Sequence, residues 1–324
     1  MLRKETQMRV LAISGGFKNG TNDAMAKEAL MGAQEVGAEI EFIHMLDLNL
    51  KPCTGCLSCV TGPDGIVNGG SARCVLKDDF LWLEDRIYEA DGVIFVMPVF
   101  EKMLPGFFKS FQDRFGGPSH DIGMLTLAKQ IHDSKGLTTP GPDPRVFKKR
   151  FATYIGIGGS DWTSWMAAHF NLFGMVTMFQ VVDTLIFSWA KSIIMDDERV
   201  ERIREAGRAI ARACADPESY RYLGEPGMCS NCHSRLLYVH EDNKTVECAV
   251  CGVKGEIISA EGKLVFRFPP EQLEHAHNLL PGKMKHVEDI GRSEGAFAAV
   301  KQTDEFKKRA KKYREFIKGT RPDK

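Results

Sequence analysis

Nine cysteines occur in this chain of 324 residues, and eight of them fall in two groups. The first group has three cysteines at three-residue spacing, Cys53, Cys56 and Cys59, and Cys74 follows after a glycine-containing stretch. Such spacing brings thiolates close enough to hold one iron–sulfur cluster or one metal ion. Zinc, a redox disulfide and reduced buried thiols are the alternatives for this group. The spacing favours redox chemistry. The ninth cysteine, Cys214, stands alone in a predicted helix.

The second group has the pattern Cys-x2-Cys-x15-Cys-x2-Cys, at Cys229, Cys232, Cys248 and Cys251. Each pair forms a knuckle, and the thiolates of two knuckles complete a tetrahedron around one ion. Structural zinc is the first interpretation. Iron is the alternative, because the segment 248–252 resembles a rubredoxin knuckle.

Hydrophobic periodicity predicts the elements that must position these cysteines. Apolar, β-branched runs predict five strands, and helical spacing of apolar residues predicts the segments between them. This alternation implies a doubly wound parallel α/β sheet. The segment 118–144 is expected to be a lid or a helical insertion. The expected strands are 9–14, 38–44, 92–97, 151–157 and 175–182, and the expected helices are 22–37, 78–90, 106–115, 162–173 and 196–214.

After residue 220 the alternation of strands and helices gives way to short strands and turns, and after residue 270 the composition is helical. The chain therefore divides into three parts. Residues 1–220 form the α/β domain, and residues 221–270 form a small module of short strands around the second cysteine group. Residues 271–324 are a helical tail, whose last stretch, 301–324, has ten Lys or Arg against four acids. We interpret this basic stretch as a solvated helix face.

Charge and hydropathy exclude several classes of function. The chain has 43 basic and 43 acidic residues, which argues against binding to nucleic acid or to an anionic membrane. Polar residues interrupt the longest apolar region, 170–189, so no transmembrane segment is expected. The N-terminal residues lack the apolar core of a signal peptide. We therefore expect a cytoplasmic protein with a small-molecule substrate.

A glycine-rich loop, 14–22, joins the first predicted strand to the first predicted helix. Here backbone N–H groups and the positive helix end face any anion, which suits a phosphate. A tight turn without a ligand is the alternative. The loop matches neither the dinucleotide-binding fingerprint nor the nucleotide-binding Gly-x4-Gly-Lys-Ser/Thr loop.

This loop, the segment 98–100 after the third strand, the segment 105–114 and the turn 158–160 together resemble the NADPH-dependent FMN reductase family. The resemblance covers residues 8–214 and implies a flavodoxin-like fold with a five-stranded sheet. The cysteines ahead of the segment 74–79 resemble those of iron–sulfur flavoproteins, which carry a compact motif for a four-iron cluster. The gap between Cys59 and Cys74 is longer than that motif.

The resemblance implies a set of site residues. The first loop would bind the FMN phosphate, the two later loops would lie along the isoalloxazine ring, and the first cysteine group would bind a 4Fe-4S cluster. No catalytic residue is assigned, and Asp161 is the best polar candidate. The implied FMN-binding residues are Ser14, Lys18, Asn19, Gly20, Thr21, Asn22, Pro98, Val99, Phe100, Glu101, Lys102, Gly158, Gly159, Ser160 and Asp161.

These expectations describe an FMN-dependent oxidoreductase with NAD(P)H as electron donor. It would reduce a small organic acceptor, and the iron–sulfur cluster would relay electrons. The alternative is a non-enzymatic carrier that passes electrons between protein partners. A third possibility is a protein whose metals are only structural and which binds partners. By analogy with related folds, we expect a homo-oligomer, either a dimer or a tetramer.

Overall fold

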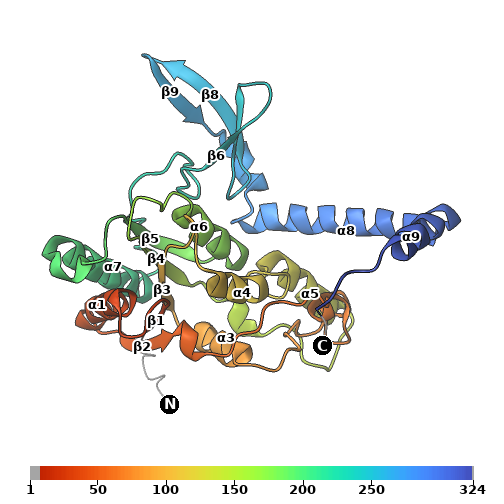
Figure 1. Cartoon of the computed structure of the whole chain (residues 1–324), viewed down its shortest axis with the longest axis horizontal. Coiled ribbons are helices and arrows are strands. Elements are labelled where there is room, and N and C mark those ends of the chain that lie inside the picture. The colour runs from red at the N-terminus through yellow and green to blue at the C-terminus, as the bar shows by residue number, and fades with distance from the viewer. Residues whose placement is uncertain (1–7, 323–324) are drawn as a thin grey trace.

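Five parallel strands form the main sheet, in the spatial order β2-β1-β3-β4-β5 (Figure 1). The computed structural model describes residues 8–322 of the chain. A helix separates each strand from the next along the chain, which is the doubly wound arrangement predicted from the sequence. The strands are β1 (Arg9–Ser14), β2 (Glu39–His44), β3 (Gly92–Pro98), β4 (Phe151–Ile157) and β5 (Gln180–Phe187).

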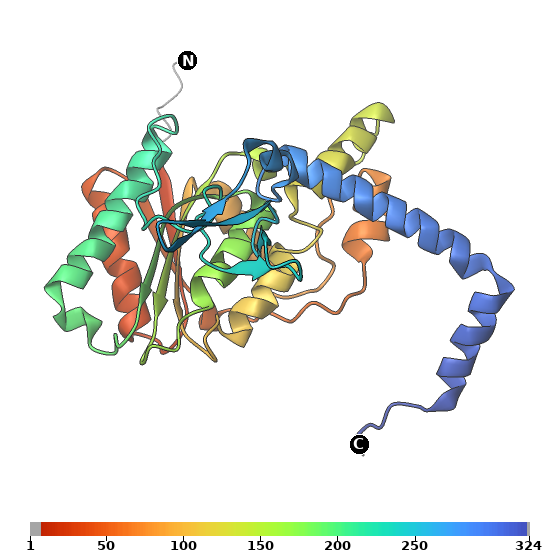
Figure 2. The same cartoon turned by 90° about the horizontal axis from the view of Figure 1, so that it is seen from above.

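Helices cover both faces of this sheet, and Figure 2 shows the layers. One face packs against α1 and α7, and the other packs against α3, α4 and α6. These helices are α1 (Thr21–Glu35), α3 (Phe80–Glu89), α4 (Gly106–Phe115), α6 (Met166–Thr177) and α7 (Asp197–Ala215).

The central strand β3 shows why the sequence forms this sandwich. All of its residues except the terminal proline are buried. Phe95 and Met97 pack into the core under α3, α4 and α6, whereas Ile94 and Val96 pack into the core under α1 and α7. A strand buried on both faces needs such a continuous apolar run, because successive side chains point to opposite faces.

The loop that carries the first cysteine group lies between β2 and α3. It contains α2 (Ser58–Thr61) and a 3-10 turn, η2 (Ile66–Asn68), which packs against α5 (Ile122–Ser134). The expected insertion at 118–144 is therefore helical, and it supports the cysteine loop. The other 3-10 turns before the second cysteine group are η1 (Met45–Asp47), η3 (Pro144–Phe147) and η4 (Ile193–Met195).

The prediction for the fifth strand is wrong in its bounds. The strand occupies Gln180–Phe187 instead of 175–182, and the preceding helix runs to Thr177 instead of residue 173. The reason is that Met175 and Val176, which read as strand residues, form the last turn of α6. The helix ends at Met178, which has a left-handed conformation (φ 53°).

The second cysteine group lies in a small antiparallel sheet with the order β6-β7-β8-β9. Its core includes three of the four cysteines and Ala168 of α6, so the module packs against the main domain. The strands are β6 (Leu237–Val239), β7 (Thr245–Cys248), β8 (Lys254–Ala260) and β9 (Lys263–Arg267).

Helices complete the chain, as predicted. A 3-10 turn, η5 (Pro270–His275), leads into α8 (Leu280–Gln302) and α9 (Asp304–Phe316). The buried amine of Lys283 lies 2.5 Å from the Asp121 carboxylate, which caps α5, and this contact docks the start of α8. Beyond it, α8 and α9 extend away from the body (Figure 2). Within residues 8–322, no helix has the length and hydropathy needed to cross a membrane.

Candidate functional site

The three loops that the sequence analysis emphasised meet at the carboxyl edge of the main sheet. The loops follow β1, β3 and β4, which are adjacent strands. The N–H of Val99 donates to the carbonyl of Ile157 (3.1 Å), and a Cβ on Gly16 would lie 3.5 Å from Pro98 Cγ. In doubly wound folds, ligands bind at this edge.

A buried carboxylate supports the first loop from below. Asp23 accepts hydrogen bonds from the Ser14 hydroxyl (2.6 Å) and from the Asn19 N–H (2.7 Å), and it lies 2.9 Å from His44 Nδ1. Burial alone would raise the pKa of Asp23, but these hydrogen bonds outweigh it and lower the pKa. The Ser14 hydroxyl is therefore bonded to Asp23 inside the protein. The sequence analysis missed Asp23 and His44, although an acid in the first turn of a helix was a usable signal.

The start of α1 leaves its first N–H groups available. Gly20 is the N-cap and offers no side-chain oxygen to them. The buried amide oxygen of Asn22 has no hydrogen-bond partner among the described residues. Thr21 donates its hydroxyl to the Lys191 carbonyl (3.3 Å). The N–H groups of the uncapped helix end fit a bound phosphate group, whereas the Asn22 oxygen is an acceptor and would pair with a hydroxyl or N–H donor.

Lys18 is the exposed cation of this loop, and it is already paired. Its amine lies 2.8 Å from both carboxylate oxygens of Asp47, at the end of η1. Both side chains are exposed, so this ion pair is weak and can yield to a ligand phosphate.

The loop after β3 forms a tight turn with two left-handed residues. Phe100 and Met103 form an isolated β-bridge, and Glu101 (φ 46°) and Lys102 (φ 67°) lie between them. The Lys102 amine lies 5.0 Å from the centre of the Trp162 ring, which belongs to the loop after β4. The turn thus projects side chains toward the neighbouring loop.

The loop after β4 carries the remaining predicted residues. The side chain of Lys191 lies beside Gly159, where a Cβ would be 2.8 Å from it. The Ser160 carbonyl accepts from the Trp189 N–H (3.3 Å), and Asp161 is exposed. The loops after β4 and β5 are therefore joined at this edge.

Exposed aromatic side chains belong to these loops. Residues of this size are usually buried, so a group of exposed ones indicates a ligand or partner surface. They are Phe17, Phe100, Trp162, Trp165 and Trp189.

The thiols of the first cysteine group share one neighbourhood. Left-handed residues, among them Gly55, wind the loop, and the Gly55 N–H lies 3.5 Å from Cys53 Sγ. Burial and the nearby thiols of Cys74, Cys53 and Cys56 raise the pKa of Cys59. Cys53 and Cys56 are exposed, while Cys59 and Cys74 are half-buried.

The second cysteine group is more tightly gathered. The sulfurs of Cys229, Cys232, Cys248 and Cys251 all lie within 4.8 Å of one another, and no other group of three or more possible ligands in residues 8–322 is as close. This arrangement fits one tetrahedral ion. The sulfurs of the first group are not gathered this closely.

The chain belongs to the NADPH-dependent FMN reductase family, whose family model matches residues 8–188. This match, together with the similarities below, indicates that the chain is an FMN oxidoreductase.

The chain is similar to two proteins over nearly its whole length and to a third protein over about a third of it. Flavone synthase cfoJ of Aspergillus candidus is 31% identical over 313 residues, which are 90% of this chain and 93% of that protein. A solved structure of a flavone reductase is 40% identical, covers 98% of this chain and 100% of its own, and has a TM-score of 0.85. An iron–sulfur flavoprotein of Methanocaldococcus jannaschii is 32% identical over 119 residues, which are 36% of this chain and half of that protein.

These findings confirm the predicted family, the flavodoxin-like sheet with a four-cysteine module and C-terminal helices, and the enzyme class. FMN is the expected cofactor on the family match, and a small-molecule substrate accords with it.

Proposed function

We propose that this protein transfers electrons from NAD(P)H to a flavone-like acceptor and reduces the double bond conjugated to its carbonyl. The similarity over nearly the whole chain to the flavone reductase structure carries this proposal. The similarity to a flavone synthase supports it, because that name also places a flavone in the reaction. Reduction of the double bond takes two electrons and two protons. NAD(P)H supplies both electrons and one proton, and the second proton comes from water or a side chain.

Bound FMN would supply the two-electron chemistry that links donor and acceptor. The protein's own residues would bind and orient both molecules. The uncapped start of α1 would hold the phosphate, and the turn at Glu101 and Lys102 would lie along the ring. Exposed Asp161 is the candidate polar side chain for contact with the acceptor at this edge.

The exposed aromatic residues of the carboxyl edge suit a planar acceptor. Their rings offer large apolar faces, and stacking on such faces is favourable. This supports a planar aromatic acceptor over a small polar one.

The two cysteine groups would have different roles. We propose that Cys53, Cys56, Cys59 and Cys74 hold a 4Fe-4S cluster, because their thiols share a neighbourhood without the close spacing of a single-ion site. We propose structural zinc for the second group, with rubredoxin-like iron as the alternative. The exposure of Cys53 and Cys56 favours a second candidate function, electron exchange with a protein partner.

The test begins with anaerobic purification and counts of FMN, iron, sulfide and zinc per chain. We expect FMN, about four irons with about four sulfides, and about one zinc. Oxidation of NADH and of NADPH is then followed with and without flavone, and mass spectrometry checks whether the product has gained two hydrogens.

The outcomes separate the proposals. A chain with FMN that oxidises NAD(P)H but leaves flavone unchanged would contradict the proposed acceptor. Flavin without sulfide would remove the cluster. Reduction of a redox protein without any reduction of flavone would favour the electron-carrier function.

A further inference from the structure

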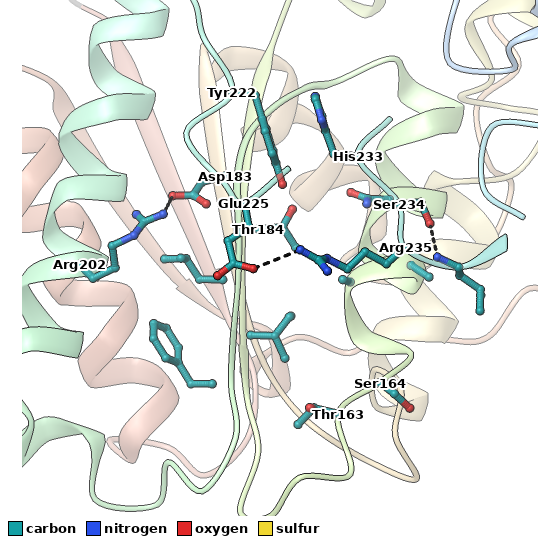
Figure 3. Close-up of a pocket in the computed structure, with 17 residues that line it drawn as sticks. Thr163, Ser164, Asp183, Thr184, Arg202, Tyr222, Glu225, His233, Ser234 and Arg235 are labelled. Carbon is teal, nitrogen blue, oxygen red and sulfur yellow. Dashed lines mark hydrogen bonds and ion pairs between the residues drawn. The ribbon is translucent and has the colours of Figure 1, made fainter. Parts of the chain in front are cut away.

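A cavity of about 590 Å³ lies outside the predicted sites, between helix α6, strand β5 and the linker 222–236 (Figure 3). Its volume falls in the range of small-molecule pockets. Its walls come from both the main domain and the segment that leads into the second cysteine group. Periodicity in the sequence could not indicate it, because neither part forms the cavity alone.

The cavity follows the outer edge of the sheet. β5 is the last strand in the order, and the Leu223 N–H donates to the Val182 carbonyl (2.7 Å) near its start. From there the cavity is lined by every residue from Asp183 to Phe187. Four residue steps along a strand span about 13 Å. The cavity is therefore long enough for a planar molecule of three rings.

One end of the cavity adjoins the carboxyl-edge loops. Thr163 and Ser164 line it, and only Trp162 separates them from the predicted site residues 158–161. The Gly158 N–H donates to the carbonyl of Phe187 (2.8 Å), which lines the same end. A ligand in the cavity would thus reach the edge where the proposed reaction takes place.

Buried polar groups line the other end. Asn171 is 7% exposed, and its amide oxygen has no hydrogen-bond partner within residues 8–322. Asp183 is fully buried, and its carboxylate lies 2.6 Å from a guanidinium nitrogen of Arg202. The other terminal nitrogen of Arg202, Nη1, is buried without a partner in the described chain. Unpaired buried polar groups are costly, so several of them around one cavity indicate a ligand that pairs with them.

The charges around the cavity favour a neutral ligand. Arg202 is paired with Asp183, and Arg235 lies 3.4 Å from Glu225, as the dashed lines of Figure 3 mark. No excess positive charge is left among these residues to bind a phosphate or a carboxylate. The apolar part of the wall includes Ile186, which suits an aromatic ring.

We infer that this cavity binds the hydroxylated end of the acceptor, and that Asn171 sets the specificity by accepting a hydrogen bond from a phenolic hydroxyl. The inference rests on the proposed function, since it names the place and the selectivity for its acceptor. The ligand class is a neutral, planar, hydroxylated aromatic compound.

The second cysteine group positions one wall of this cavity. The rings of Tyr222 and His233 stack in parallel with their centres 3.9 Å apart, and both line the cavity (Figure 3). His233 directly follows Cys232, and its backbone N–H donates to the Cys229 carbonyl (3.0 Å). A metal bound there would therefore hold this wall in place.

The test compares unsubstituted flavone with 4′-hydroxyflavone and 7-hydroxyflavone. In the holoenzyme, we expect at least one hydroxyflavone to have a kcat/KM about tenfold above that of flavone, because a site built for a hydroxyl discriminates against analogues that lack it. Asn171→Leu should remove this preference. Gln302→Leu, at the exposed end of α8, is the matched control and should keep the preference.

Two further measurements keep the inference falsifiable. The dissociation constant of the preferred hydroxyflavone for the oxidised holoenzyme should rise about tenfold in Asn171→Leu. If Asn171→Leu does not fold, Ser164→Trp, at an exposed position, blocks the cavity and should weaken binding of all three flavones. Equal use of all three flavones by the unmodified enzyme, or an unchanged preference in Asn171→Leu, would overturn the inference.

Failure of the proposed function gives a different result. If the enzyme binds the hydroxyflavone through Asn171 but reduces no flavone, the cavity is supported and the reaction is not. If it reduces flavones without any contribution from Asn171, the reaction is supported and the cavity is not. If the enzyme neither binds nor reduces any of these flavones, the cavity inference and the proposed function are both overturned.

Discussion

Arg114 of α4 and Asp78 form a buried ion pair at the base of the cysteine loop, with Nη2 3.0 Å from Oδ1 and a second contact between Nη1 and Oδ2. The side chains are 1% and 0% exposed. The same guanidinium donates to the carbonyl of Lys51 (3.1 Å) and to Cys74 Sγ (3.3 Å). One arginine thus joins the two ends of the loop that carries the first cysteine group.

Replacement of this arginine should destabilise the protein strongly. Arg114→Met leaves the Asp78 carboxylate buried without its partner, which costs about 3–5 kcal/mol. Chemical denaturation measures the change in the free energy of unfolding. The control is Arg292→Met, which removes an exposed ion pair with Asp289 and should cost at most about 1 kcal/mol. Similar costs for the two variants would contradict the role of Arg114.

Acid should lower the free energy of unfolding, because two buried carboxylates become protonated. Burial raises the pKa of both Asp23 and Asp78, but hydrogen bonds lower it more, so each folded-state pKa lies below the ordinary value of about 3.9. The stabilisation is therefore fully present above that value, and it is lost as the pH falls below it through the folded-state pKa.

Unfolding free energies between pH 7 and pH 2 test this pH dependence, because the loss begins only below about pH 3.9. The unmodified protein should lose stability toward acid faster than Asp78→Asn, because the variant has one fewer carboxylate to protonate. Parallel curves for the two proteins would show that Asp78 does not contribute to acid sensitivity.

The main sheet could be predicted from the sequence because its strands are buried on both faces. A continuous apolar run such as β3 has few other interpretations in an α/β chain. The four-cysteine module was equally accessible, since two Cys-x2-Cys pairs specify a tetrahedral site by spacing alone. The fifth strand was misplaced because Met175 and Val176 suit a helix end as well as a strand, and only the left-handed residue Met178 decides between them.

The parts of the site that escaped prediction depend on long-range contacts. Asp23 meets His44 from the end of another strand, and Arg114 reaches a loop that precedes it by at least 36 residues. Asn171 looked like an ordinary polar residue in an apolar helix, and only the packed structure shows that its amide oxygen lies unpaired beside a cavity. Local spacing carries no information about such contacts.

Close packing of α1 against α7 requires glycine at position 207. A Cβ there would lie 1.8 Å from the Ala29 carbonyl oxygen, so the helix backbones would have to separate. We expect Gly207→Ala to lower the free energy of unfolding by about 1–3 kcal/mol. The control, Gly291→Ala, lies in α8 with nothing within 4 Å of the added Cβ, and it should raise stability by up to about 1 kcal/mol. Thermal unfolding of both variants checks the opposite signs, and stabilisation by Gly207→Ala would contradict the packing.

Removal of the metal from the second cysteine group should open the cavity beside β5. Three cysteines of the group belong to the small buried core of this module, together with residues such as Val250 and Val253. Without an ion, four thiols at this spacing have no common partner, and so small a core cannot hold the module folded. We expect Cys248→Ser to lose about one metal ion per chain and to become sensitive to proteases within residues 229–267.

Cys214→Ser is the control, because this half-buried cysteine of α7 lies outside both groups and the variant should keep the metal. Metal analysis and limited proteolysis provide the two readouts. Because Tyr222 and His233 form one wall of the cavity, Cys248→Ser should also weaken binding of hydroxyflavones. A metal-free module that stays resistant to proteases and still binds the ligand would show that the protein fold alone, and not the ion, holds this wall in place.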